Sequence, residues 1–262
     1  MNQTDSRVAP HPVLSDYYGS ECVRRERVDR MFDASAEHYD WINSVMSFGT
    51  GEWYRRDALK RIGIQPGMMV LDAGTGTGVV AAIEQELVGV DGLVVALDPS
   101  AGMLGEAKKR GVRHIAQGLG ETLPFGADQF DRITMSYALR HVADLRVLFA
   151  EYRRVLKPGG KLLILEITRP EGRFTRALLH LYMKTVVPGL TRLLRRSVEA
   201  QELMRYYWDT IEHCVPPDTI TGIMRSTGLE DVGRNVMFGT FSEYRATKPA
   251  LPAAGGQQGE TA

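Results

Sequence analysis

The stretch G-T-G-T-G at 74–78 is the part of the sequence with the clearest chemical meaning, and it follows an apolar run. A buried strand that turns through glycines into a helix lets a ligand approach the backbone and offers it unpaired N–H groups. The glycines Gly74, Gly76 and Gly78 have G-x-G-x-G spacing, and Val79 replaces the third glycine of dinucleotide-binding folds. The spacing predicts a nucleoside-binding loop and makes a nicotinamide dehydrogenase an unfavoured alternative.

Two acidic residues near this loop narrow the range of possible ligands further. Asp98 lies twenty residues after Gly78, at the end of the next apolar run, where a carboxylate can accept hydrogen bonds from ribose hydroxyls. Asp72 precedes the loop, where its charge would repel a pyrophosphate and suit a ligand with an ammonium and a sulfonium group. The pattern favours S-adenosylmethionine over a purely structural glycine turn.

The elements that must position these residues alternate along the chain. We expect strands at 68–71, 93–97, 113–116, 132–136 and 161–167, and helices at 79–87, 101–110 and 145–156. This alternation predicts an α/β fold with a mostly parallel sheet covered on both faces. Two further strands, 231–237 and 240–247, are separated only by Phe238 and Gly239, so they must pair antiparallel. A further helix is expected at 219–227, directly before these two strands.

The flanking segments have different compositions. Residues 1–20 are expected to be a flexible arm, 21–60 an N-terminal helical lid, and 61–248 the catalytic domain. Within it, 170–214 is apolar and basic and predicts a helical cap over a hydrophobic acceptor, with contact to a membrane surface left open. The Pro, Gly and Ala-rich tail at 249–262 is expected to be disordered.

Composition limits the partners. The chain has 262 residues, with 32 Lys and Arg balancing 32 Asp and Glu, so no nucleic-acid binding is expected. Cys22 and Cys214 indicate neither a disulfide framework nor a metal site. No apolar stretch of the roughly 20 residues of a membrane span occurs. We expect a cytoplasmic protein that binds no metal and that contacts the inner face of the membrane at most peripherally. Whether it forms a homodimer is left open.

Several longer segments resemble a known family. The chain is similar to class I S-adenosylmethionine-dependent methyltransferases, and within them to the ubiquinone/menaquinone biosynthesis C-methyltransferases. The matching segments are M-F-D-A-S-A-E-H-Y-D-W-I-N-S-V-M-S-F-G (31–49), the glycine loop, E-T-L-P-F-G-A-D-Q-F-D (121–131), S-Y-A-L-R-H-V-A-D (136–144) and R-V-L-K-P-G-G-K-L-L-I-L-E-I-T-R-P (154–170). The resemblance implies a Rossmann-like, seven-stranded methyltransferase fold with S-adenosyl-L-methionine as cofactor, and it becomes thin after residue 170.

The resemblance also implies roles for single residues. Implied cofactor contacts are Asp72, Gly74, Gly76, Thr77, Gly78, Asp98, Leu119, Gly120 and Ser136, with Tyr39 over the sulfonium. Arg140 falls in the family's L-R-N-V segment near the substrate, and His141 replaces its Asn. Leu119 replaces an acidic or amide residue that contacts adenine.

The chemistry expected of this site is methyl transfer to a hydrophobic acceptor. Carbon methylation needs an electron-rich acceptor, such as an ionised quinol or phenol, so His141 is the leading candidate for a general base. The structural alternatives are a capping histidine, a packed Tyr39 and a paired Arg140. The rival functions are methylation of an isoprenoid alkene or prenyl diphosphate, and a cofactor-binding scaffold without activity.

Overall fold

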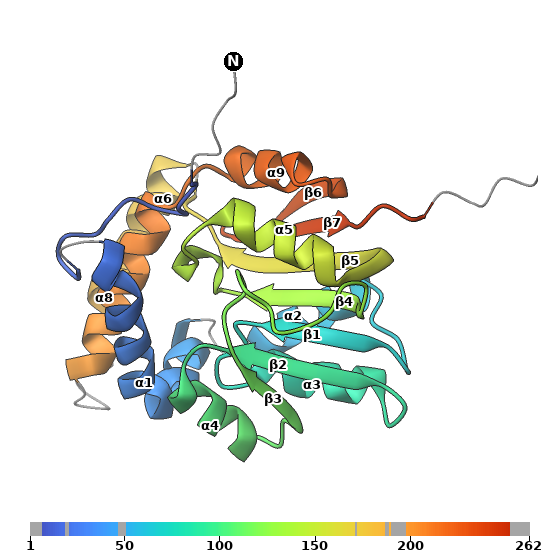
Figure 1. Cartoon of the computed structure of the whole chain (residues 1–262). Helices are drawn as coiled ribbons and strands as arrows, with labels where there is room; N and C mark the ends of the chain where they lie inside the picture. The colour runs from blue at the N-terminus through green and yellow to red at the C-terminus, as the bar shows by residue number, and fades with distance from the viewer. Residues whose placement is uncertain are drawn as a thin grey trace, which may run out of the picture.

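The computed structural model describes residues 7–18, 21–46, 51–170, 172–186, 189 and 198–251. A seven-stranded sheet lies at its centre in the order β3-β2-β1-β4-β5-β7-β6 (Figure 1). Its strands are β1 (Met69–Ala73), β2 (Leu93–Asp98), β3 (His114–Gln117), β4 (Phe130–Ser136), β5 (Leu156–Ile167), β6 (Glu230–Met237) and β7 (Phe241–Thr247). Strands β1 to β5 are parallel, and β7 is antiparallel to both β5 and β6. The predicted Rossmann-like fold with its C-terminal hairpin is confirmed.

Helices cover both faces of the sheet. One face packs against α5 (Leu145–Val155) and α9 (Pro217–Ser226). The other packs against α2 (Gly51–Arg61), α3 (Val79–Val88) and α4 (Ala101–Lys109). Both faces of the central strands bury apolar side chains, as expected of a parallel sheet covered on both sides, with Asp72 and Thr134 as buried polar exceptions.

A third apolar cluster lies at the end of the sheet where the parallel strands finish. It joins α1 (Glu21–Met46) to α8 (Val198–His213), and the two helices lie side by side in Figure 1. Between β5 and α8 the chain forms α6 (Arg173–Leu181) and a π-helical turn, η2 (Tyr182–Val186). Part of the predicted cap, residues 171, 187–188 and 190–197, lies outside the described residues.

The structure describes residues 7–18 of the expected arm and both helices of the expected lid. Residues 7–18 are packed against the domain, because Leu14 and Tyr18 are buried in the third cluster and the carbonyls of Val8 and Pro10 accept backbone hydrogen bonds. Of the two helices in 21–60, only α1 reaches the end of the sheet, whereas α2 packs on its face through Leu59 and neighbouring residues. The predicted tail lies outside the described residues from 252 onward.

Strand β5 starts earlier than predicted. The sequence K-P-G-G at 157–160 favours a turn, and these residues form a bulge within the strand Leu156–Ile167: Leu156 pairs with Phe130 of β4, and the regular pairing resumes at Lys161 with Arg132. Gly159 and Gly160 exchange backbone hydrogen bonds with Lys248, directly after β7, so pairing with the hairpin extends the strand. No helix within the described residues is long and apolar enough to cross a membrane.

Candidate active site

The glycine loop connects β1 to α3 and has the backbone that its glycines predict. Gly74, Gly76 and Gly78 all have positive φ angles, between 56° and 77°. A Cβ atom at Gly74 would lie 2.6 Å from the Cβ of Ala138, and one at Gly78 would lie 2.7 Å from Cγ2 of Val112. Glycine is therefore required at both positions for conformation and for space.

Asp98 ends β2 beside this loop, and both of its carboxylate oxygens are oriented by the backbone. Oδ2 accepts from the N–H of Gly76 and Oδ1 from the N–H of Ser100, each at 2.9 Å. Burial raises the pKa of Asp98 to about 6, while these two hydrogen bonds favour the ionised form. At neutral pH the side chain presents a fixed carboxylate that can accept hydrogen bonds from a ribose diol.

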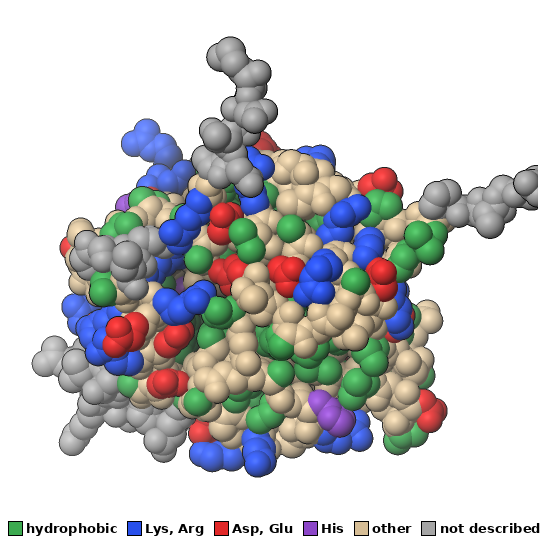
Figure 2. Space-filling model, in the orientation of Figure 1, with side chains coloured by type: hydrophobic (Ala, Val, Ile, Leu, Met, Phe, Trp, Pro, Cys, Tyr) green, Lys and Arg blue, Asp and Glu red, His purple; other side chains and the backbone are tan. Residues whose placement is uncertain are grey.

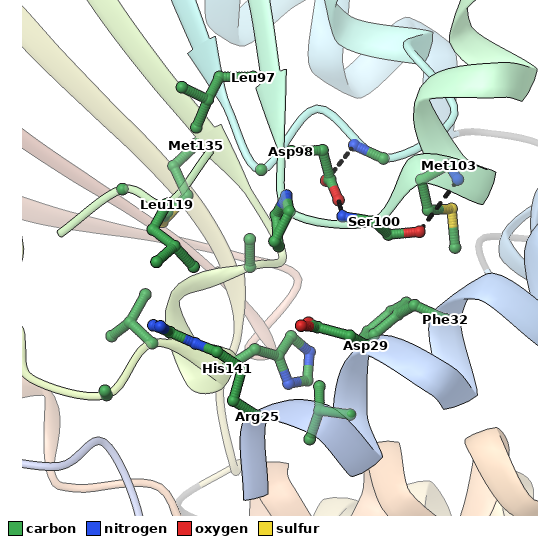
Figure 3. A pocket seen from close by; sticks show the side chains of 18 of the residues that line it. Arg25, Asp29, Phe32, Leu97, Asp98, Ser100, Met103, Leu119, Met135 and His141 are labelled. Carbon is green, nitrogen blue, oxygen red and sulfur yellow. Dashed lines mark hydrogen bonds between the residues drawn. The ribbon is translucent and has the colours of Figure 1, made fainter. Parts of the chain in front are cut away.

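A cavity of about 430 Å³ opens between the loop and α1 (Figure 3). Eight of the predicted site residues line it: Tyr39, Gly74, Gly76, Asp98, Leu119, Gly120, Ser136 and His141. Figure 3 shows Asp98 and Ser100 at one end and His141, Arg25 and Asp29 at the other. Leu97, Met103 and Leu119 add apolar walls near Asp98, which suit a flat purine ring. The volume and the lining fit a nucleoside cofactor.

Helix α1 is fastened over the cavity at two points. Asp33 accepts hydrogen bonds from the Ser100 hydroxyl at 2.5 Å and the Gly102 N–H at 2.9 Å. Asp40 accepts one from the Thr77 hydroxyl and pairs with Arg110. Thr77 is buried and outside the cavity lining, so its side chain holds α1 to the loop.

Asp72 lies beneath the loop, outside the cavity lining, so the predicted direct contact with the ligand is not what the structure shows. Its carboxylate accepts hydrogen bonds from the hydroxyls of Thr75 at 2.6 Å and Thr134 at 3.2 Å. The reason is position: Asp72 is a residue of β1, and its side chain points to the buried Thr134 and Glu84. Gly78 likewise packs against Val112 rather than the cavity.

The buried carboxyl of Asp72 is expected to make stability depend on pH. Burial raises its pKa to about 6 from 3.8, so the folded protein binds this proton more tightly than the unfolded chain does. The stabilisation is present below about pH 4 and is lost as the pH rises through about 6. Relative to Asp72→Asn, the wild-type unfolding free energy should fall on the order of 2–3 kcal/mol between those limits. Denaturant unfolding at a series of pH values measures it, and an unchanged difference would refute the burial account.

His141 lines the end of the cavity opposite Asp98. It ends a short 3-10 helix after β4, and its ring lies 5.1 Å from Phe32 and stacks at 5.4 Å on Tyr206. Its Nδ1 is 3.1 Å from the Tyr206 hydroxyl, and its buried Nε2 has no partner among the described residues. Burial and the nearby charges of Arg140 and Arg24 lower its pKa well below the usual value. This environment opposes the protonation that a general base requires.

Arg140, the neighbouring residue, points away from the cavity. It is buried and pairs with the equally buried Glu166 at 2.9 Å, and its guanidinium lies over the ring of Tyr207. The predicted contact with a substrate is absent from this arrangement, because the side chain of Arg140 pairs with Glu166 in the interior and is outside the cavity lining. Arg140 has the structural role that its pairing indicates.

Other cavity residues escaped the sequence analysis. Arg25, Asp29 and Phe32 lie on one face of α1 and line the cavity beside His141 (Figure 3). Their i, i+4, i+7 spacing is the helical signal that could have identified them. Burial raises the pKa of Asp29, whereas Arg25 opposes the rise. Asp29, rather than Asp72, brings a carboxylate to the cavity, where it can face a cationic ligand.

Comparisons with known proteins agree with this geometry. Residues 21–248 match the ubiE/COQ5 methyltransferase family. A ubiquinone/menaquinone biosynthesis C-methyltransferase UbiE from Shewanella sp. (strain W3-18-1) is 35% identical over 246 residues, covering 89% of this chain and 97% of that protein. The UbiE of Shewanella sediminis is 36% identical over 229 residues, covering 83% and 90%.

Solved structures share the fold at lower identity. A phosphoethanolamine N-methyltransferase 2 from Haemonchus contortus, in complex with S-adenosyl-L-methionine, aligns with a TM-score of 0.62 at 20% identity, over 86% of this chain and 60% of that one. A methyltransferase from Thermotoga maritima aligns with a TM-score of 0.59 at 20% identity, over 84% and 98%. At these identities the likeness concerns the fold alone.

Proposed function

The chain belongs to the ubiE/COQ5 methyltransferase family and is an S-adenosylmethionine-dependent methyltransferase, and from this premise we propose that it methylates a carbon atom of a prenylated quinol. Two curated relatives are named C-methyltransferases of ubiquinone and menaquinone biosynthesis, which supports this acceptor class. The observation that carries the proposal is the end of the cavity beside His141, where aromatic rings surround the space.

The cofactor supplies an electrophilic methyl group on a sulfonium, and the chain's residues hold and orient it. Asp98 would accept hydrogen bonds from the ribose hydroxyls, and Leu97 and Leu119 would enclose the adenine ring. Asp29 would balance positive charge at the other end. Tyr39 lies over the loop, with Cε1 3.9 Å from the place of a Gly76 Cβ, where it would help to exclude water.

The acceptor end suits a flat, electron-rich ring. Phe32, Tyr39 and His141 line this end of the cavity, and the buried ring of Tyr207 packs behind them with centroid distances of 6.0–6.4 Å. Such aromatic walls bind a ring by stacking and edge contacts, and keep water from the reacting carbon. A prenyl tail would continue toward the apolar cluster between α1 and α8.

An acceptor screen tests the proposal. The purified protein, S-adenosylmethionine and a short-tailed demethylated prenyl naphthoquinol, kept reduced, should yield methylated quinol and S-adenosylhomocysteine in equal amounts. Prenyl diphosphates and simple phenols are the comparison acceptors. If the protein methylates a prenyl diphosphate and not the quinol, the prenylated-quinol proposal is wrong and prenyl diphosphate is the acceptor class.

Prenyl diphosphate is the second candidate acceptor, because arginines also line the cavity. Arg7 and Arg25 are exposed at its opening, and Arg24 is buried beside them. Guanidinium groups at such a position can bind a diphosphate through paired hydrogen bonds. The same screen distinguishes the two candidates, since a diphosphate acceptor would lose binding on Arg25→Ala and a quinol would not.

We also propose that α6 contacts an anionic membrane surface, where a prenylated acceptor would reside. Phe174, Leu178 and Leu181 lie at i, i+4 and i+7 and are exposed, at 81%, 58% and 54%. Lys and Arg side chains gather at the molecular edge where α6 and α8 lie (Figure 2). An apolar helix face flanked by basic residues is the pattern of interfacial helices.

Vesicle sedimentation tests this contact. Wild-type protein should sediment with phosphatidylglycerol vesicles, and Leu178→Glu should lower the bound fraction about tenfold, because it places a charge in the apolar face. Val90→Glu is the matched control, since Val90 is equally a surface residue, 89% exposed, at the opposite end of the sheet. Equal binding by both variants would refute a role for α6.

A further inference from the structure

Two histidines lie on either side of one buried arginine, and the first has a tautomer that its neighbours determine. His11 Nδ1 is 2.8 Å from the carbonyl oxygen of Pro12, which can only accept, so Nδ1 carries the hydrogen. His11 Nε2 is 3.0 Å from Nη2 of Arg24, which can only donate, so Nε2 is bare. Burial and Arg24 lower the pKa of His11 to about 4, which agrees with a neutral ring.

The same arginine reaches toward the second histidine through a tyrosine. Arg24 Nη2 donates to the carbonyl of Arg140 at 3.1 Å, and its guanidinium, which can only donate, lies near the Tyr206 hydroxyl. A donor on that side faces a lone pair of the Tyr206 oxygen and leaves the tyrosine's hydrogen for another partner. Nδ1 of His141 lies 3.1 Å from that oxygen. Donation from Tyr206 to Nδ1 is the direction that fits a donating Arg24 beside the same hydroxyl.

Electrostatics opposes a positively charged ring at His141. Arg24 of α1 and Arg140 of the preceding residue face it, and Tyr206 and Tyr207 of α8 stack on it. A neutral imidazole whose Nδ1 accepts a hydrogen bond carries its hydrogen on Nε2. Nε2 is buried next to the cavity and has no partner among the described residues. A buried donor without a partner is unfavourable, and a ligand oxygen in that place would satisfy it.

We propose that His141 donates a hydrogen bond from Nε2–H to an oxyanion of the methyl acceptor, and that Tyr206 and Arg24 are positioning residues that hold this tautomer. The inference rests on the proposed function and gives the acceptor a chemical requirement: a hydroxyl, conjugated with the reacting carbon, that binds ionised. The nearby arginines favour that anion.

The step balances without proton transfer to His141. The acceptor releases its hydroxyl proton to solvent, the ring carbon forms a bond to the methyl group, and the bond from that methyl to sulfur breaks. The hydrogen on the methylated carbon then leaves to solvent as the ring regains aromaticity. His141 keeps its hydrogen throughout and stabilises the oxygen from which electron density flows.

Two variants of His141 separate donation from base catalysis. Glutamine places an amide N–H near the position of Nε2 and cannot take up a proton at neutral pH. With the naphthoquinol as acceptor, His141→Ala should lower kcat about 10²–10³-fold, as loss of an oxyanion donor does. His141→Gln should stay within about tenfold of wild type. Equal losses in the two variants would overturn the proposal and indicate a base.

A spectroscopic measurement tests the tautomer without turnover. Nitrogen NMR of histidine-labelled protein, alone and with S-adenosylhomocysteine, should show His141 protonated at Nε2 and bare at Nδ1. Tyr206→Phe should mix the two tautomers, whereas Tyr244→Phe, at a buried tyrosine in the sheet, should not. Wild-type protein protonated at Nδ1 would overturn the proposal. Failure of quinol turnover with the expected tautomer would instead count against the acceptor class.

Discussion

Replacement of Asp98 by alanine is expected to weaken binding of S-adenosylhomocysteine by at least about 100-fold. A carboxylate that accepts two hydrogen bonds from ribose hydroxyls contributes about 1.5–3 kcal/mol for each bond. The backbone N–H groups of Gly76 and Ser100 hold both oxygens in place before the ligand binds. Binding therefore loses little side-chain conformational entropy at Asp98. Calorimetric titration measures the change.

The matched control for this variant lies near the opposite end of the same strand. Asp91 is an exposed residue of the turn before β2, and Asp91→Ala should leave the affinity unchanged. Thermal unfolding of both variants checks that the fold persists. An Asp98→Ala protein that is folded and binds with wild-type affinity would show that the ribose is held elsewhere.

Arg140→Met is expected to lower the unfolding free energy by about 3–5 kcal/mol, because it leaves Glu166 buried without its partner. Both side chains are at most 1% exposed, and the two groups are 2.9 Å apart. Replacing both residues by methionine should recover most of the loss, since an apolar pair of similar volume removes the buried charge altogether. Denaturant unfolding of the single and double variants measures this.

A surface pair provides the comparison for Arg140. Arg30 and Glu26 pair on the exposed side of α1 at 3.0 Å, and Arg30→Met should cost less than about 1 kcal/mol. A cost this small for Arg140→Met, together with a large loss of kcat, would restore the catalytic role that the sequence suggested for Arg140.

The sheet was predictable because the position of each strand follows from a short stretch of sequence. Most of the parallel strands contain short apolar runs bounded by glycines or polar residues, and the two-residue spacer at Phe238 and Gly239 allows only a hairpin. The glycine loop and Asp98 were predictable for the same reason, since strand ends place them at one edge of the sheet. The start of β5 was not, because Gly159 and Gly160 join the strand by pairing with Lys248, distant in sequence.

The acceptor end depends on contacts between distant segments. Tyr206 and Tyr207 come from α8, outside the segments from which the sequence analysis recognised the family, yet they pack on His141. Arg140 pairs with the buried Glu166, whereas its neighbour His141 lines the cavity, and their residue types do not reveal this difference. Asp72 and Asp29 are a second pair that the sequence does not distinguish. Asp72 is close to the glycine loop in sequence but is buried outside the cavity lining, whereas Asp29, on α1, lines the cavity.

The position of the transferred methyl group tests the account most directly. S-adenosylmethionine with an isotope-labelled methyl group, the purified protein and the demethylated prenyl naphthoquinol are incubated, and the product is analysed by NMR. We predict the label on the ring carbon next to an oxygen-bearing carbon, with both quinol hydroxyls unmethylated. A label on oxygen or on the prenyl chain would contradict carbon methylation of the quinol ring.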